Sequence, residues 1–209
     1  AFGYADRENG IVADADTVYE WGSISKTLVW VSVMQLWERG EIDLEKDIRE
    51  YLPEGFLRKL KYDDPITMLN LMNHNAGWSE NVWAFQTDNE EEIKSLGEIL
   101  QETEPVQVYR PGEVSSYSNY GAALAGYVVE CITEQPFHEY VHENIFEPLG
   151  MENSTFEYTR TVTPYMNLSS VVIYIFIIFI IVFTVLLLAV FILRKITKKQ
   201  FFSSKISLV

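Results

Sequence analysis

The chain is organised around the stretch Trp21-Gly22-Ser23-Ile24-Ser25-Lys26, which runs directly into an apolar segment at 27–39. Gly40 follows that segment, so we predict a buried helix that ends there. Residues three apart are neighbours on a helix surface, so Ser23 and Lys26 are predicted to place a hydroxyl and an amine together. A partly desolvated lysine can take the proton of a serine hydroxyl, and N–H groups at a helix start can stabilise negative charge. The stretch therefore predicts an activated nucleophile.

The same stretch has a simpler interpretation. Serine is common immediately before a helix, where its hydroxyl caps the first turn. Ser23 would then be an N-cap and Lys26 a solvated residue of the first turn. The stretch alone leaves both interpretations open.

Hydrophobicity divides the chain at residue 171. Residues 171–193 read VVIYIFIIFIIVFTVLLLAVFIL, without a charge, glycine or proline. At about 1.5 Å per residue a helix of this length spans roughly 34 Å, which is enough to cross a bilayer. We therefore predict a transmembrane helix at 171–193, preceded by a linker at 157–170 and followed by a tail at 194–209.

Charge divides at the same place. All 30 acidic residues and 11 of the 16 basic ones precede residue 171, which gives that part a net charge of −19. The five basic residues of the tail predict a cytoplasmic tail and an extracytoplasmic N-terminal domain in a single-pass protein of the cell membrane. Such an acidic domain is not expected to bind nucleic acid. Because the chain lacks an initial Met and a signal-peptide pattern, we expect that an export signal was removed or that the sequence is a fragment.

The sequence gives no support for a metal site or another cofactor. Cys131 is the single cysteine and lies in an apolar run, which predicts a core position. His138 and His142 are four residues apart, but no third ligand is evident, so we interpret them as surface residues.

Apolar spacing and turn residues predict an α+β arrangement. We expect a hairpin that pairs 1–5 with 17–21, and a turn at Pro111-Gly112. Helices are expected at 27–39, 65–72, 90–102, 122–132 and 136–146, and a surface turn with a short helix is expected within 41–51. These elements place Ser23 and Lys26 at the head of the first helix, and Tyr117 and Asn119 just before the helix at 122–132.

With these elements placed, residues 3–156 resemble the serine β-lactamase-related family, which contains class C β-lactamases, D-alanyl-D-alanine carboxypeptidases and related esterases. The resemblance rests on motifs that occur in the family's order. They are Gly3-Tyr4-Ala5-Asp6, Gly22-Ser23-Ile24-Ser25-Lys26, Met34-Gln35-Leu36, the stretch from Leu44 through Tyr51-Leu52-Pro53, Leu71-Met72-Asn73-His74-Asn75-Ala76-Gly77, Pro111-Gly112, Tyr117-Ser118-Asn119-Tyr120-Gly121 and Pro148-Leu149-Gly150-Met151.

The resemblance implies a role for each motif residue. Ser23 would be the acylated nucleophile, with its own backbone N–H as half of an oxyanion hole, and Lys26 would be its proton partner. Tyr117 would be a general base and acid, which requires a nearby cation such as Lys26 to stabilise the phenolate. Asn119 would hold the substrate amide or orient Lys26, and His74 would support the wall of the site.

One departure from the family pattern leaves the activity open. The family carries a third motif, Lys-Thr-Gly or His-x-Gly, on a strand opposite the serine, and these 209 residues contain no such triplet. The resemblance therefore implies a β-lactamase/transpeptidase-like fold with an incomplete sheet in a partial domain at 1–156.

Two functions remain as hypotheses. The first is a membrane-anchored serine hydrolase that forms an acyl-enzyme with a β-lactam, a D-alanyl peptide or an ester, so that its partners are a small-molecule or peptidoglycan-like substrate and the membrane. The alternative is an inactive, truncated homologue that binds a partner or is a degenerate remnant. The sequence does not decide the oligomeric state.

Overall fold

The structure is a computed structural model that describes residues 2–80 and 94–156. The chain divides into two compact units, Trp21–Tyr158 and a second unit made of Ala1–Glu20 with Thr159–Val209. Within the described ranges, no helix is long and apolar enough to cross a membrane. The predicted linker at 157–170, the predicted span at 171–193 and the predicted tail at 194–209 lie outside those ranges.

A short hairpin forms the described part of the smaller unit. Strand β1 (Tyr4–Asp6) pairs antiparallel with β2 (Ile11–Val12), and a bulge separates the two aligned residue pairs. The Asn9 backbone N–H and side-chain amide both donate to the Asp6 carboxylate, at 3.0 and 2.6 Å, and Gly10 has a φ of 69°. This tight turn brings residues 11–12, and not residues 17–21, back to pair with β1, so the predicted partner strand at 17–21 is wrong.

Helix α1 (Lys26–Glu38) is the first long helix of the larger unit, and a single 3-10 turn, η1 (Gly22–Ser25), precedes it. The predicted stop at Gly40 is confirmed. Gly40 has a φ of 73° and its N–H donates to the Trp37 carbonyl at 2.9 Å, while the Glu41 N–H donates to the Leu36 carbonyl at 2.9 Å. These bonds satisfy carbonyl groups that a helix end otherwise leaves free.

Helix α1 buries only one side, so the expectation of a fully buried helix is wrong. Val33 and Leu36 are fully buried in the core of the larger unit. Val31, Met34 and Trp37 are instead 40%, 36% and 51% exposed. Because these three residues follow one another at intervals of three, the exposed apolar residues form a stripe along the helix.

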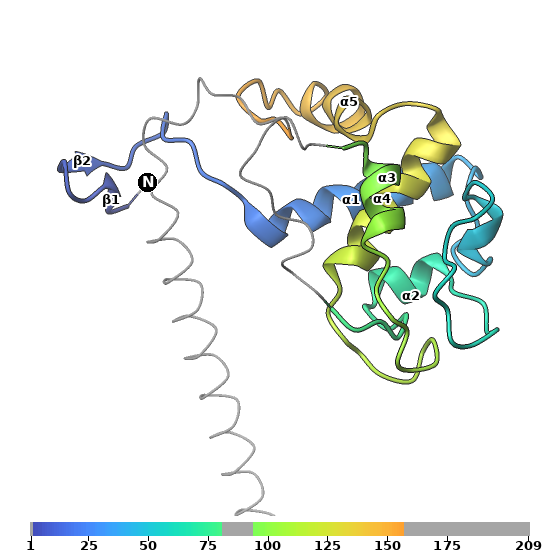
Figure 1. The fold of residues 1–209 in the computed structure, drawn as a ribbon. Coiled ribbons are helices and arrows are strands. Elements are labelled where there is room, and N and C mark those ends of the chain that lie inside the picture. Colours follow the sequence, from blue (N-terminus) through green and yellow to red (C-terminus); the bar gives the residue numbers. More distant parts are fainter. Residues whose placement is uncertain (1, 81–93, 157–209) are drawn as a thin grey trace, which may run out of the picture. The chain divides into compact units, whose positions relative to one another are not determined.

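Helix α4 (Asn119–Thr133) is the centre of the larger unit, and it contacts α1, α2 (Met68–Met72) and α3 (Leu96–Glu102) (Figure 1). Leu124 and Val128 on α4 are fully buried between these helices. The helix predicted at 122–132 is thus confirmed but starts earlier, at Asn119.

Capping residues explain why α2 and α3 start later than predicted. Thr67 is the N-cap of α2 and forms a capping box with Asn70, so the helix does not begin at Pro65. Ser95 is the N-cap of α3 and forms the same motif with Glu98, so the chain at Lys94 is not yet helical. The predicted residues 90–93 lie outside the described ranges.

The predicted helix at 136–146 is confirmed as two consecutive segments. Helix α5 (Phe137–Val141) continues into a π-helical turn, η5 (His142–Phe146). Pro136 precedes the first residue, where its missing N–H costs nothing. Helix α5 packs on both α1 and α4.

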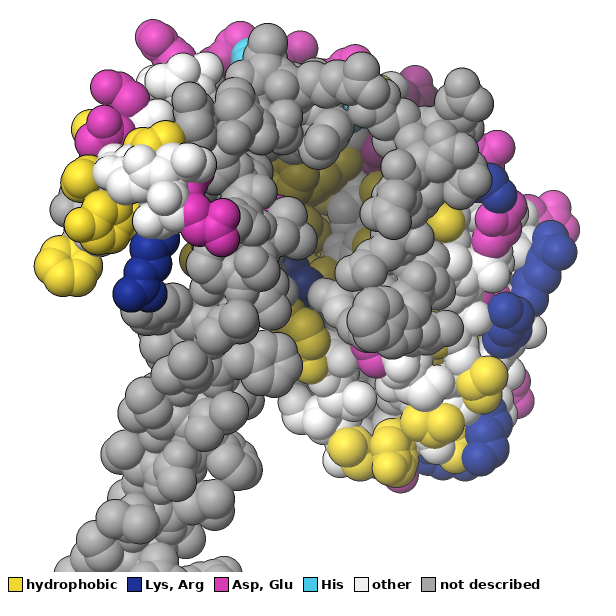
Figure 2. Space-filling view, turned by 60° about the vertical axis from the view of Figure 1, so that its left-hand side comes forward, with side chains coloured by type: hydrophobic (Ala, Val, Ile, Leu, Met, Phe, Trp, Pro, Cys, Tyr) yellow, Lys and Arg dark blue, Asp and Glu magenta, His cyan; other side chains and the backbone are white. Residues whose placement is uncertain are grey.

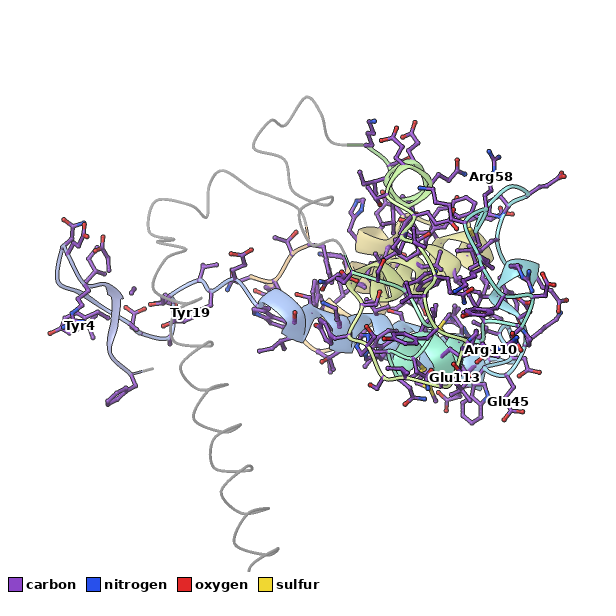
Figure 3. All side chains as sticks on the ribbon, turned by 60° about the horizontal axis from the view of Figure 1, so that its bottom comes forward. Tyr4, Tyr19, Glu45, Arg58, Arg110 and Glu113 are labelled. Atoms are coloured by element: carbon purple, nitrogen blue, oxygen red, sulfur yellow. The ribbon has the colours of Figure 1, made fainter. Side chains whose placement is uncertain are left out.

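The predicted turn at Pro111-Gly112 is also confirmed. Gly112 has a φ of 86°, and the Glu113 N–H donates to the Arg110 carbonyl at 3.2 Å. The Arg110 N–H in turn approaches the Glu113 carboxylate at 3.4 Å, and the two side chains lie close together in Figure 3. This turn leads the chain towards Tyr117.

Basic side chains on the surface are mixed with acidic ones. Figure 2 shows Lys and Arg side chains next to Asp and Glu side chains on the visible face of the described residues. Lys46 lies 2.6 Å from Glu50, and Lys94 lies 2.6 Å from Glu102. The Lys and Arg side chains visible in Figure 2 are dispersed among other side chains and do not form a continuous basic surface.

Candidate active site

Ser23 and Lys26 meet as the spacing predicted. Ser23 is exposed in η1, and the Lys26 Nζ donates to the Ser23 Oγ at 3.3 Å. The N-cap of α1 is Ser25, which makes no side-chain capping bond, and the residue before η1 is Trp21. The interpretation of Ser23 as an N-cap is therefore wrong, because its hydroxyl lies against the amine.

Lys26 is held by residues that lie far from it in the sequence. Its Nζ donates to the Asn119 Oδ1 at 2.7 Å and lies 5.0 Å from the centroid of the Tyr117 ring. The lysine is only partly exposed. The interpretation of Lys26 as a freely solvated residue is therefore wrong as well. The structure brings all four predicted site residues, Ser23, Lys26, Tyr117 and Asn119, into one cluster.

Tyr117 lies at the edge of this cluster and is 50% exposed. Its ring lies 4.4 Å from the His74 ring, at an interplanar angle of 36°. In the described contacts Lys26 meets the face of the tyrosine ring and does not donate a hydrogen bond to its hydroxyl. The geometry thus places a cation at the phenol ring, while the proton-transfer role of Tyr117 stays a prediction.

His74 holds the segment that carries Tyr117. It has a φ of 52°, and its carbonyl accepts the Ser116 N–H at 2.6 Å. Its Nδ1 accepts the Ser118 N–H at 3.2 Å, which requires that this ring nitrogen carries no proton. Burial of the ring, together with the nearby charge of Lys26, lowers the pKa of His74. The ring is therefore held in its neutral form beside the tyrosine.

Glu80 is a site residue that the sequence did not reveal. Its Oε1 accepts the Asn119 backbone N–H at 2.9 Å, across 39 positions of sequence. A single acid after Gly77-Trp78-Ser79 carries no pattern that distinguishes it from a surface residue. Only the fold could reveal this contact.

Gly77 fixes the segment between His74 and Glu80. Its carbonyl accepts the Val108 N–H at 2.8 Å and the Tyr109 N–H at 3.0 Å. Its φ is 89°, and a Cβ at this position would lie 2.0 Å from the Tyr109 carbonyl oxygen. Glycine is thus required both by the backbone conformation and by the close approach of the segments that contain Gly77 and Tyr109.

The described residues contain no cluster of three or more histidine, cysteine or acidic side chains that could hold a metal ion. His142 Nδ1 lies 3.4 Å from Glu147, and the pair is exposed.

The four clustered side chains offer a hydroxyl, an amine, a carboxamide and a phenol ring in contact. An amine that has lost its proton could accept one from the hydroxyl, as nucleophilic catalysis requires.

Comparisons with known proteins agree with this arrangement. The family described as Beta-lactamase matches residues 1–165. The chain is 26% identical over 167 residues to the putative penicillin-binding protein PbpX of Bacillus subtilis (strain 168), a match that covers 78% of this chain and 39% of PbpX. The chain therefore spans about two fifths of that relative's length.

Solved structures show the same fold. The octameric penicillin-binding protein homologue from Pyrococcus abyssi superposes with a TM-score of 0.62 at 27% identity, covering 72% of this chain and 35% of that one. The β-lactamase/D-alanine carboxypeptidase from Yersinia pestis superposes with a TM-score of 0.66 at 23% identity, covering 79% and 48%. The fold is therefore β-lactamase/transpeptidase-like, and the chain belongs to the Beta-lactamase family.

Proposed function

We propose that this protein is a serine hydrolase that works through an acyl-enzyme. The observation that carries the proposal is the position of the Lys26 Nζ, which donates to both the Ser23 Oγ and the Asn119 Oδ1. In its neutral form Lys26 would accept the Ser23 proton while the Oγ attacks a carbonyl carbon. Ser23 lies in the first turn of η1, where backbone N–H groups have no partner within the helix and can stabilise the resulting oxyanion.

The proton then has to reach the leaving group. As the tetrahedral intermediate collapses, the C–N or C–O bond breaks, and the leaving nitrogen or oxygen takes a proton from Lys26 or through Tyr117. Water then attacks the carbonyl carbon of the acyl-enzyme and gives a proton to the same groups, which pass a proton to the Ser23 Oγ as the ester bond breaks and the acid product leaves. Asn119 keeps Lys26 in position and offers its amide to the substrate.

The substrate class is inferred from the relatives. One is called a penicillin-binding protein, and another is described as a β-lactamase/D-alanine carboxypeptidase. A β-lactam, a D-alanyl peptide and an ester all offer the carbonyl that Ser23 would attack. We therefore propose a small-molecule or peptidoglycan-like substrate.

Covalent labelling tests this function. The full chain is incubated with a fluorescent penicillin or a fluorophosphonate, and the labelled peptide is identified by mass spectrometry. We expect label on Ser23 and none after Ser23→Ala. Ser25→Ala is the matched control, because Ser25 lies in the same turn and makes no side-chain capping bond. Label that persists in Ser23→Ala contradicts the proposal.

A second candidate is a catalytically inactive member of the family that binds a partner. The observation that favours it is the absence of a Lys-Thr-Gly or His-x-Gly triplet from the 209 residues. This alternative predicts that the intact chain takes up no label from either reagent. It also predicts that Ser23→Ala leaves every binding constant unchanged.

We also propose that residues 171–193 anchor the protein in the cell membrane, with residues 1–156 on the extracytoplasmic side. The proposal rests on the apolar length of that segment and on the basic residues that follow it. Such an orientation would bring the site to the side of the membrane where peptidoglycan lies.

A further inference from the structure

Glu80 lies beside the site, although no step of the proposed reaction uses it. Its Oε1 accepts the backbone N–H of Asn119, the first residue of α4. A carboxylate at this end of a helix is favoured by the helix dipole, and a bond from an N–H to an ionised acceptor is stronger than one between neutral groups. Glu80 is therefore bound to the residue that holds Lys26.

The contact is the first of three consecutive hydrogen bonds. The Glu80 carboxylate holds the Asn119 backbone at 2.9 Å, the Asn119 Oδ1 holds the Lys26 Nζ at 2.7 Å, and that Nζ reaches the Ser23 Oγ at 3.3 Å. The Ser118 hydroxyl caps α4 through the Gly121 N–H at 2.9 Å and does not touch Lys26 in the described contacts. Of these two groups at the start of α4, only Glu80 is bonded to the residue that contacts the amine.

The second carboxylate oxygen shows that this arrangement has an energetic cost. In the described part of the chain Glu80 Oε2 is buried and has no hydrogen-bond partner. An unpaired buried oxygen destabilises a fold, and such groups are retained at functional sites more than elsewhere. A carboxylate that served only to cap α4 would gain nothing from burying this oxygen.

The geometry points to Glu80 as a positioning residue of the proposed hydrolase. It fixes the Asn119 backbone, and through the Asn119 side chain it fixes the direction in which Lys26 presents its amine to Ser23. This inference rests on the proposed function for its effect on rate. Its effect on the position of Lys26 does not depend on activity.

Three variants isolate the effect. Glu80→Ala removes the acceptor, and Glu80→Gln keeps an acceptor oxygen for the Asn119 N–H. Glu98→Ala is the matched control, because Glu98 also accepts a backbone N–H at a helix start, that of Ser95 at 3.1 Å, but on α3 and without contact with the four site residues. Thermal unfolding of each variant establishes that it is folded.

The first measurement is the limiting rate of Ser23 labelling at saturating fluorescent penicillin. We expect Glu80→Ala to lower this rate by about ten- to a hundredfold, since a displacement of about 1 Å in a catalytic group can cost about a hundredfold. The concentration for half-saturation should stay the same. Glu80→Gln should restore the rate, and Glu98→Ala should leave it unchanged.

The second measurement is the rate at which acetic anhydride modifies Lys26, followed by mass spectrometry with the exposed Lys46 as an internal reference. We expect Glu80→Ala to raise the Lys26 rate several-fold, because a released amine is more accessible, and Glu80→Gln to leave it unchanged. This measurement needs no catalytic activity.

Together the two measurements separate the inference from the proposed function. Exposure of Lys26 in Glu80→Ala, combined with no labelling of any variant, supports the positioning role and contradicts the hydrolase. Normal labelling of Glu80→Ala with a protected Lys26 contradicts the positioning role and supports the hydrolase. Equal effects of Glu80→Ala and Glu98→Ala on both rates also contradict the positioning role.

Discussion

His74 couples the site to pH through one ring nitrogen. Its Nδ1 accepts the Ser118 N–H, and burial together with the charge of Lys26 lowers the pKa of the ring below the ordinary value of 6.5. Between pH 6.5 and this lowered pKa the unfolded chain binds a proton that the folded chain does not. The contribution of His74 to stability is therefore complete above pH 6.5 and is lost as the pH falls towards the lowered pKa.

We expect the free energy of unfolding of the wild type to fall more steeply below pH 6.5 than that of His74→Gln. Urea unfolding of both proteins above and below this pH measures the difference. His142→Gln is the control, since His142 is exposed and belongs to η5, which carries none of the four site residues. A difference between wild type and His74→Gln that does not vary with pH would contradict the prediction.

A second prediction for a single residue concerns Gly77. Its φ of 89° costs an alanine roughly 1–2 kcal/mol, and the added Cβ would also collide with the Tyr109 carbonyl at 2.0 Å. Gly112 has a similar φ of 86° but no atom within 4 Å of its added Cβ. We expect Gly77→Ala to lower the melting temperature much more than Gly112→Ala does. Equal losses would show that backbone conformation alone matters.

At the scale of the element, the start of α4 carries both stability and the site. The Ser118 hydroxyl accepts the Gly121 N–H at 2.9 Å, so Ser118→Ala should cost about 1 kcal/mol of unfolding free energy. Ser95→Ala removes the corresponding cap of α3 and should cost a similar amount. Because α4 alone carries Asn119, only Ser118→Ala should slow Ser23 labelling. Slowing by both variants would mean that general stability controls the rate.

The long elements could be predicted from the sequence because their signals are strong and local. The apolar run of α1 with Gly40 after it, and the run before Thr133, each determine a helix from neighbouring residues alone. Shorter elements depend on side-chain bonds, so the capping box of Thr67 and the bonds between Asn9 and Asp6 moved their boundaries. A propensity argument does not include such bonds.

The site residues also differ in how far the sequence alone could reveal them. Ser23 and Lys26 were predictable because a spacing of three residues in a helical turn brings two side chains together. Asn119 became a candidate only through the resemblance to a family motif. Glu80 could not be found, because its contact with Asn119 joins a loop to the start of α4, and that approach depends on the packing of α2 against α4.

For the whole molecule, the prediction concerns the segment at 171–193. We expect the full chain to stay with membranes after an alkaline wash, because the proposed anchor would bury the apolar residues of 171–193 in lipid, and a chain lacking 171–193 to be released. Protease added to intact cells should then degrade residues 1–156 and spare the tail. Release of the full chain, or protection of residues 1–156, would contradict the proposed anchor and its orientation.

The ring of His74 also has an optical consequence. The Trp30 indole lies edge-on to it, with the ring centroids 6.1 Å apart and an interplanar angle of 72°. A charged imidazole accepts an electron from an excited indole more readily than a neutral one does, and so quenches its emission. Trp30 is therefore a built-in fluorescent reporter of the charge of His74. The part of the tryptophan emission that is lost in Trp30→Phe follows that charge without any added dye.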